Sequence, residues 1–161
     1  MDQVLTVLEK HLGIFTGNDG DSATTSTMIN NYVKQNVVLS PVKKKYQKEQ
    51  LAQLLIIGIA KRVLSISEID ELIRFLSRTR PLKEAYDLFC ETFENALKVT
   101  FGEKPCGERY CTGSADSAVT ALNAACLAVA DKILVTKILL ANRKAEENEK
   151  TQKKKSAPGR E

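Results

Sequence analysis

Apolar residues recur at helical spacing along most of the chain, and short polar stretches separate the patterned segments. In 2–13, 28–35, 48–64, 66–77 and 82–100 the apolar positions repeat every three or four residues, which is typical of amphipathic helices. No window shows period-two alternation between hairpin turns, the pattern that predicts strands. The hydrophobic pattern therefore predicts an all-α fold.

Local signals indicate where some of these helices begin and end. A polar loop over 16–27 precedes the short helix, and Thr25 or Ser26 is its expected N-cap. Asn36 can end the same helix, because asparagine tolerates the left-handed conformation. Ser65 and Glu68 have the spacing of a capping box at the start of the 66–77 helix.

A long final helix is predicted from about 114 to 144, and it contains an apolar seam at heptad spacing. Its many alanines allow a neighbouring helix to approach closely. The seam can pack against this chain's own helices or form a homodimer interface, and the sequence leaves both open. From about 145 onward the composition predicts a disordered basic tail. The seam consists of Val119, Leu122, Cys126, Val129, Ile133, Thr136 and Leu140.

Charge is distributed unevenly along the 161 residues, although the net charge is only +4. Residues 34–62 hold seven basic residues and one acid, a net +6, and residues 143–161 hold seven basic and four acidic residues, a net +3. The remainder therefore carries −5. A local basic patch on an acidic body is the electrostatic pattern of a nucleic-acid binder.

Several classes of protein lack support in the sequence. The first residues do not resemble a signal peptide, and the longest apolar run, 54–60, is far shorter than the roughly 20 residues that span a bilayer. We therefore expect a cytoplasmic protein without membrane contact. Phosphate-loop, His-Glu metal and nucleophile–base motifs are lacking, so we predict no enzyme activity and no cofactor.

Four cysteines leave one chemical question open. Cys90 and Cys126 fall at positions expected in helix cores. Cys106 and Cys111 flank a short loop, and we expect idle thiols there in a cytoplasmic protein. The four residues between them are just within the C-x₂₋₄-C spacing of metal sites, which leaves a zinc site or a redox pair as the alternative.

The order of elements over residues 26–73 resembles the DNA-binding domain of the MerR family. A capped short helix with a tyrosine is followed by an extended turn, a basic stretch ending in tyrosine, an apolar helix and a helix opened by Ser-x-Ser-Glu-Ile. The matching residues are Tyr32 and Lys34, Val37-Val38-Leu39-Ser40-Pro41, Lys43-Lys44-Lys45-Tyr46, Glu49, Gln50, Leu51 and Leu54, and Leu64 to Ile69. The resemblance implies a winged helix-turn-helix over 1–80, followed by a C-terminal helical bundle or dimerisation helix over 81–145. The disordered basic tail predicted from the composition then covers 146–161.

Within this region, residues 28–34 and 43–46 also resemble a family of bacterial proteins known as a domain of unknown function and often described as MerR-like. That similarity extends from residue 1 to about 142 and implies no established activity. Asn36 stands where MerR proteins usually have glycine, and the wing is short.

The MerR resemblance gives each candidate DNA-binding residue an expected role. Asn30, Asn31 and Gln35 offer amides that can pair with adenine edges in a major groove. Lys34, Lys43, Lys44 and Lys45 can reach phosphates, and Tyr46 can anchor the wing on the core.

These roles lead to three hypotheses for the protein. We expect a homodimeric transcription regulator that binds double-stranded DNA and has an unidentified effector. The first alternative is a helical protein-interaction module without DNA binding. The second is a ligand or metal sensor in which Cys106 and Cys111 form the switch.

Overall fold

The protein is helical in the parts of the chain that the structure describes. A computed structural model describes residues 2–15, 24–43, 45–103 and 116–155. Within these ranges the β-type pairing consists of one isolated bridge, between Val42 and Lys45, so the predicted all-α fold is confirmed. The helices are α1 (Asp2–Leu12), α2 (Ser26–Lys34), α3 (Lys48–Ala60), α4 (Ile66–Ser77), α5 (Leu82–Thr100) and α6 (Ser117–Lys155), and a 3₁₀ turn, η1 (Gly13–Phe15), follows α1.

Side-chain caps hold the predicted helix starts. The Thr25 hydroxyl accepts a hydrogen bond from the backbone N–H of Met28 at 3.2 Å, which begins α2. At α4, Ser65 Oγ accepts from the Glu68 N–H at 3.3 Å, and Glu68 Oε2 accepts from the Ser65 N–H at 2.7 Å. This reciprocal pair is the predicted capping box. Asn36 has a φ of 58°, the expected left-handed conformation after α2.

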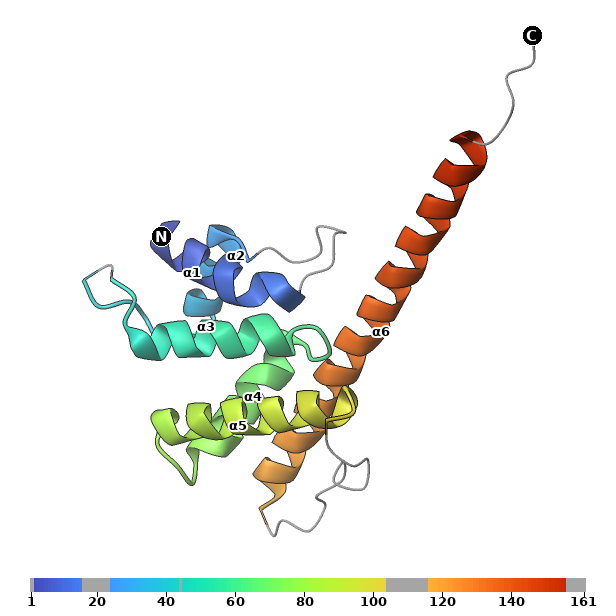
Figure 1. Ribbon diagram of the computed structural model, residues 1–161. Helices are drawn as coiled ribbons and strands as arrows, with labels where there is room; N and C mark the ends of the chain where they lie inside the picture. Colours follow the sequence, from blue (N-terminus) through green and yellow to red (C-terminus); the bar gives the residue numbers. More distant parts are fainter. Residues whose placement is uncertain (1, 16–23, 44, 104–115, 156–161) are drawn as a thin grey trace.

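The hydrophobic interior consists of two neighbouring clusters. One is built mainly from α1, α2, α3 and the segment after α2, and the other from the end of α4, α5 and the first half of α6. Phe15 and Ile59 pack against both clusters, so the two parts share a continuous interior. Figure 1 shows α5 lying across the start of α6, while α6 continues away from the other helices as a rod.

Helix α3 differs from the prediction in its end and in its buried face. It ends at Ala60 and not at residue 64, and Val63, predicted to be buried, is exposed in the turn that follows. Leu54 is buried as expected. Two polar side chains, Gln50 and Gln53, are also buried, which the apolar periodicity did not indicate.

The heptad seam of α6 packs mainly against this chain's own helices. Leu122, Cys126, Val129 and Ile133 are buried in the second cluster, so these seam residues are not available as a dimer interface. Cys90, predicted to lie in a helix core, is exposed on α5. Burial raises the pKa of the Cys126 thiol to about 12, which makes it unreactive as a nucleophile.

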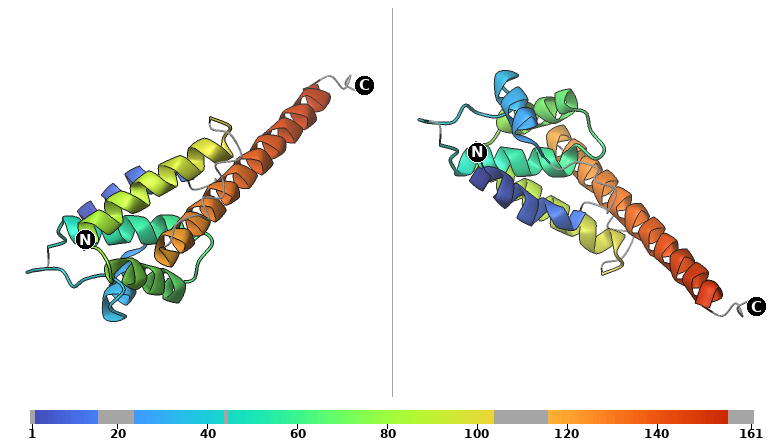
Figure 2. Two further views of the ribbon diagram at one scale, coloured as in Figure 1. Left: turned by 90° about the horizontal axis from the view of Figure 1, so that it is seen from below. Right: turned by 90° about the horizontal axis from the view of Figure 1, so that it is seen from above.

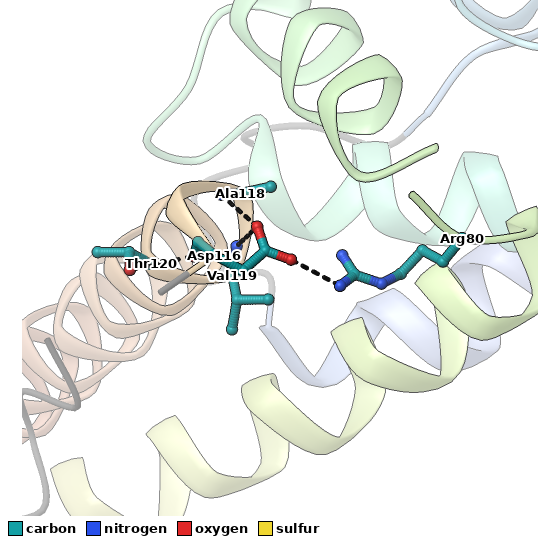
Figure 3. Close-up of polar contacts among 5 residues, drawn as sticks. All are labelled: Arg80, Asp116, Ala118, Val119 and Thr120. Atoms are coloured by element: carbon teal, nitrogen blue, oxygen red, sulfur yellow. Dashed lines mark hydrogen bonds and ion pairs between the residues drawn. The ribbon is translucent and has the colours of Figure 1, made fainter. Parts of the chain in front are cut away.

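The start and the end of α6 also differ from the sequence-based bounds. The helix begins at Ser117, where Asp116 Oδ1 accepts hydrogen bonds from the N–H groups of Ala118 (2.9 Å) and Val119 (3.4 Å). Figure 3 shows the other carboxylate oxygen of Asp116 accepting from Arg80 Nη2 at 2.7 Å, which ties α6 to the α4–α5 connection. At the far end, residues 146–155 of the predicted disordered tail are helical. Residues 156–161 lie outside the described parts.

Candidate nucleic-acid interface

Helix α2 presents a polar face opposite a buried one. Ile29 and Tyr32 point into the first cluster, and burial raises the pKa of the Tyr32 hydroxyl. Asn30, Asn31 and Lys34 are exposed. Gln35, the C-cap residue, is exposed as well, and its N–H donates to the Asn31 carbonyl at 2.9 Å. The four predicted α2 residues therefore lie together on the solvent side of one short helix.

A sharp reversal of the chain follows α2. Both Val37 and Val38 donate their N–H groups to the carbonyl of Tyr32, at 3.0 and 3.3 Å, and both side chains are buried. The left-handed Asn36 makes this closure possible. Residues 37–46, called the connecting segment from here on, therefore leave α2 in a fixed direction.

Two buried glutamines of α3 hold the connecting segment in place. The side-chain oxygen of Gln53 accepts a hydrogen bond from the Leu39 N–H at 3.0 Å. Gln50 uses both ends of its amide: Nε2 donates to the Ser40 carbonyl at 3.1 Å, and Oε1 accepts from the Gln47 N–H at 2.8 Å. A buried amide is favourable when its polar atoms have partners, and backbone groups of Leu39, Ser40 and Gln47 supply these three bonds.

The connecting segment carries a minimal hairpin. The N–H of Val42 donates to the Lys45 carbonyl at 3.0 Å, and the Lys45 N–H donates back to Val42 at 2.8 Å. Lys43 adopts a φ of 49°, as tight two-residue turns require. Lys43 and Lys45 are exposed, and Lys44 lies outside the described residues. Both views of Figure 2 show the connecting segment projecting beyond the helices at the end where α3 begins.

The aromatic residue after the hairpin and its neighbours complete the site. Tyr46 is half-buried and packs against the first cluster, the position expected of an anchor. Lys48 is exposed at the start of α3 and adds a positive charge, although it is not among the candidate DNA-binding residues predicted from the sequence. Leu39 and Val42 are 52% and 56% exposed, so the segment also presents apolar surface.

Part of the basic patch predicted over 34–62 lies elsewhere. Lys61 and Arg62 follow the C-terminal end of α3, about 20 Å from Lys48 at the ~1.5 Å rise of a helix. Both side chains are half-buried and have partners. The positive charge of the candidate interface therefore comes from lysines between 34 and 48.

The metal-sensor alternative depends on a cluster of ligand side chains. Across them, no group of three or more His, Cys, Asp or Glu side chains is placed to hold a metal ion. Cys106 and Cys111 lie outside the described residues. An apolar cavity of about 30 Å³ between α3, α4, α5 and α6 has room for little more than a water molecule. In the described residues, no helix is both long and apolar enough to cross a membrane.

The comparisons with known proteins identify a family for this chain. Neither the curated proteins nor the solved structures yield a similar chain. Residues 1–89 match the family described as Domain of unknown function (DUF1836). The match spans α1 to α4, the connecting segment and the first part of α5, and so includes the whole candidate interface. Because it covers more than half of the chain, this protein belongs to the DUF1836 family.

Proposed function

We propose that this protein is a transcription regulator that binds double-stranded DNA through a MerR-like winged helix-turn-helix. In this proposal α2 is the recognition helix, and the hairpin of Val42 to Lys45 is a minimal wing. The single observation that carries it is the clamp by Gln50 and Gln53, which holds a lysine-bearing hairpin in a fixed relation to an amide-bearing helix.

The two parts of the interface would do different work. Amide side chains can make paired hydrogen bonds to adenine in the major groove, which is the role of Asn30, Asn31 and Gln35. Lysines contact phosphates without reading sequence, which is the role of Lys34, Lys43, Lys44 and Lys45. The proposed function is therefore recognition and not catalysis.

Fluorescence anisotropy with a labelled random duplex tests the proposal. Binding measured at about 50 and 200 mM salt should weaken steeply, with a log–log slope of about 0.9 for each phosphate contacted. The Lys43/Lys44/Lys45→Ala variant should bind more weakly and show a shallower slope. The matched control, Lys83/Lys144/Lys150→Ala, removes the same charge from other exposed sites and should retain the wild-type slope. Equal slopes for both triple variants would refute the wing assignment.

Base contacts are tested separately, by site selection. Asn30→Ala and Asn31→Ala should relax the sequence preference at adenine positions by about 1–3 kcal/mol per lost pair and leave the salt slope unchanged. If wild type and both variants select the same DNA sequence, the assignment of α2 as the recognition helix is refuted.

The exposed apolar residues of the connecting segment favour a second candidate, a protein-interaction module. Leu39 and Val42 are more than half exposed, and such side chains commonly mark protein contacts. This candidate predicts no DNA affinity at low salt. It also predicts that a pull-down with wild type recovers a protein partner and that a pull-down with Val42→Asp does not.

A further inference from the structure

A groove of about 510 Å³ lies between α4 and the first part of α6. Both views of Figure 2 show these two helices side by side. The groove shares no residue with the candidate nucleic-acid interface, which is formed by α2, the connecting segment and the start of α3. A role for the groove is therefore independent of DNA binding. The apolar residues on its α4 side are Val63, Leu64, Leu72 and Phe75.

The α6 wall of the groove is made of alanines. Ala121, Ala124 and Ala128 are exposed, and at about 100° per residue the three fall within about 60° on one side of the helix. They extend over about 10 Å, or roughly two helical turns. Where the contact residues are small, the axes of two packed helices can approach to about 8 Å. The wall therefore allows the backbone of another helix to lie close along it.

The charges that line the groove are negative. Glu68 and Glu71 are exposed on its α4 side. Hydrogen bonds from Ser65 hold the pKa of Glu68 below its ordinary value, so its carboxylate is ionised at neutral pH. Within the described part of the chain, Glu71 has no cation as its partner. Lysine and arginine are absent from the described residues that line the groove, although Arg78 lies over the ring of Phe75.

The open form of the groove favours a helix over a small molecule as its occupant. A small-molecule site encloses most of the surface of its ligand. Here Val63 is 36% exposed and the three alanines are exposed as well, so the occupant must cover the walls from outside. An amphipathic helix can do this, because its apolar stripe fills a groove while its polar sides remain in water. Glu68 and Glu71 are complementary to lysine or arginine beside that stripe.

We propose that the α4–α6 groove is a docking site for a basic amphipathic helix of a partner protein. The apolar stripe of the partner helix lies between α4 and the alanines of α6, and its lysines or arginines face Glu68 and Glu71. The partner bridges α4, which is inside the part of the chain that matches the family, and α6, which is beyond it.

Selection from a library of displayed helical peptides tests the proposal. The peptides have roughly 18 residues, about 27 Å at ~1.5 Å per residue, and their apolar and charged positions are randomised. The full chain is the bait, and a counter-selection on Ala124→Arg removes peptides that bind elsewhere. Arginine suits this exposed helical position, so the variant should fold. The recovered peptides should carry apolar residues every three or four positions, with lysine or arginine beside them.

Fluorescence anisotropy with a recovered peptide, synthesised and labelled, measures the individual contacts. Wild type should bind it with a Kd on the order of 10 μM or tighter. Ala124→Arg should raise this Kd at least about tenfold, and Glu71→Lys at least about threefold. Glu91→Lys is the matched control, because it makes the same change of charge at an exposed position of α5, and it should leave the Kd unchanged. A peptide with glutamate in place of its basic residues should bind Glu71→Lys more tightly than it binds wild type.

Three outcomes would overturn the docking of a partner helix. In the first, no recovered peptide distinguishes wild type from Ala124→Arg, or the recovered peptides lack basic residues, while circular dichroism shows that the variants are folded. In the second, the lipophilic cation tetraphenylphosphonium binds wild type and not Glu71→Lys, and no peptide is recovered, which would assign the groove to a small ligand. In the third, wild type self-associates and Ala124→Arg does not, which would assign the groove to a second copy.

Discussion

The hydrogen bond between Gln53 and the connecting segment gives a sharp prediction about stability. Gln53→Met keeps the length and approximate volume of the buried side chain and removes its amide oxygen. The Leu39 N–H, which donates to that oxygen at 3.0 Å, then loses its partner. Gln53 is only 6% exposed, so the methionine that replaces it is expected to stay buried.

The expected loss follows from the surroundings of the two groups. A lost hydrogen bond to a neutral partner costs about 0.5–1.5 kcal/mol, and a buried donor left unsatisfied costs about 1–3 kcal/mol. The Leu39 side chain is 52% exposed, so water can reach its backbone more easily than a fully buried one. We therefore expect Gln53→Met to reduce the free energy of unfolding by about 1–2 kcal/mol, which lowers Tm by about 3–6 °C at this chain length.

Two measurements together check this expectation. Urea denaturation gives the change in the free energy of unfolding, and amide hydrogen exchange followed by NMR reports on Leu39 itself. The Leu39 amide should be protected in wild type and exchange faster in the variant. Gln3→Met is the matched control, because Gln3 is exposed on α1 and should change neither quantity. Unchanged protection of Leu39 in Gln53→Met would refute the clamp, whatever the stability.

Two further predictions concern helix packing and the start of α6. Gly58→Ala should destabilise the wild-type protein by about 1–3 kcal/mol, because a Cβ at this position would overlap Cδ1 of Leu12. In the Leu12→Ala background the overlap is gone, so the higher helix propensity of alanine should make the same substitution stabilising. Urea denaturation of the four proteins checks this change of sign. Asp116→Asn keeps a cap for α6 and removes the ion pair with Arg80, so Tm should fall in the order wild type, Asp116→Asn, Asp116→Ala. Arg80 holds the pKa of Asp116 below its ordinary value, so the ionised carboxylate stabilises the fold at pH values above that ordinary pKa. The difference in Tm between wild type and Asp116→Asn should therefore vanish as the pH falls and Asp116 is protonated. Thermal melts at decreasing pH would contradict this if the difference in Tm persisted.

Local patterns in the sequence predict the helices well because caps and periodicity act over a few residues. Ser65 and Glu68 make their predicted reciprocal hydrogen bonds, and Asn36 takes the left-handed conformation. Both outcomes depend on neighbours within one helical turn. The exposed positions of Asn30 and Lys34 follow in the same way from the period of α2.

Contacts between distant segments are what the sequence does not reveal. Gln50 and Gln53 look like solvent-facing residues, and they are buried because the connecting segment folds back over them. A heptad seam shows that α6 has an apolar side without showing what covers it. The charged end of α6 lacks apolar spacing, yet it is helical, with local bonds such as Asn142 Nδ2 to Glu146 Oε1 at 2.9 Å.

The projecting rod of α6 governs how the molecule moves through water. Its 39 residues extend on the order of 60 Å, whereas a compact chain of 161 residues has a radius of gyration of about 15 Å. Friction rises with such elongation, so diffusion is slower than for a sphere of 17.8 kDa. A monomer will therefore leave a gel-filtration column ahead of globular standards of equal mass. Elution volume alone would therefore overestimate the mass of the protein.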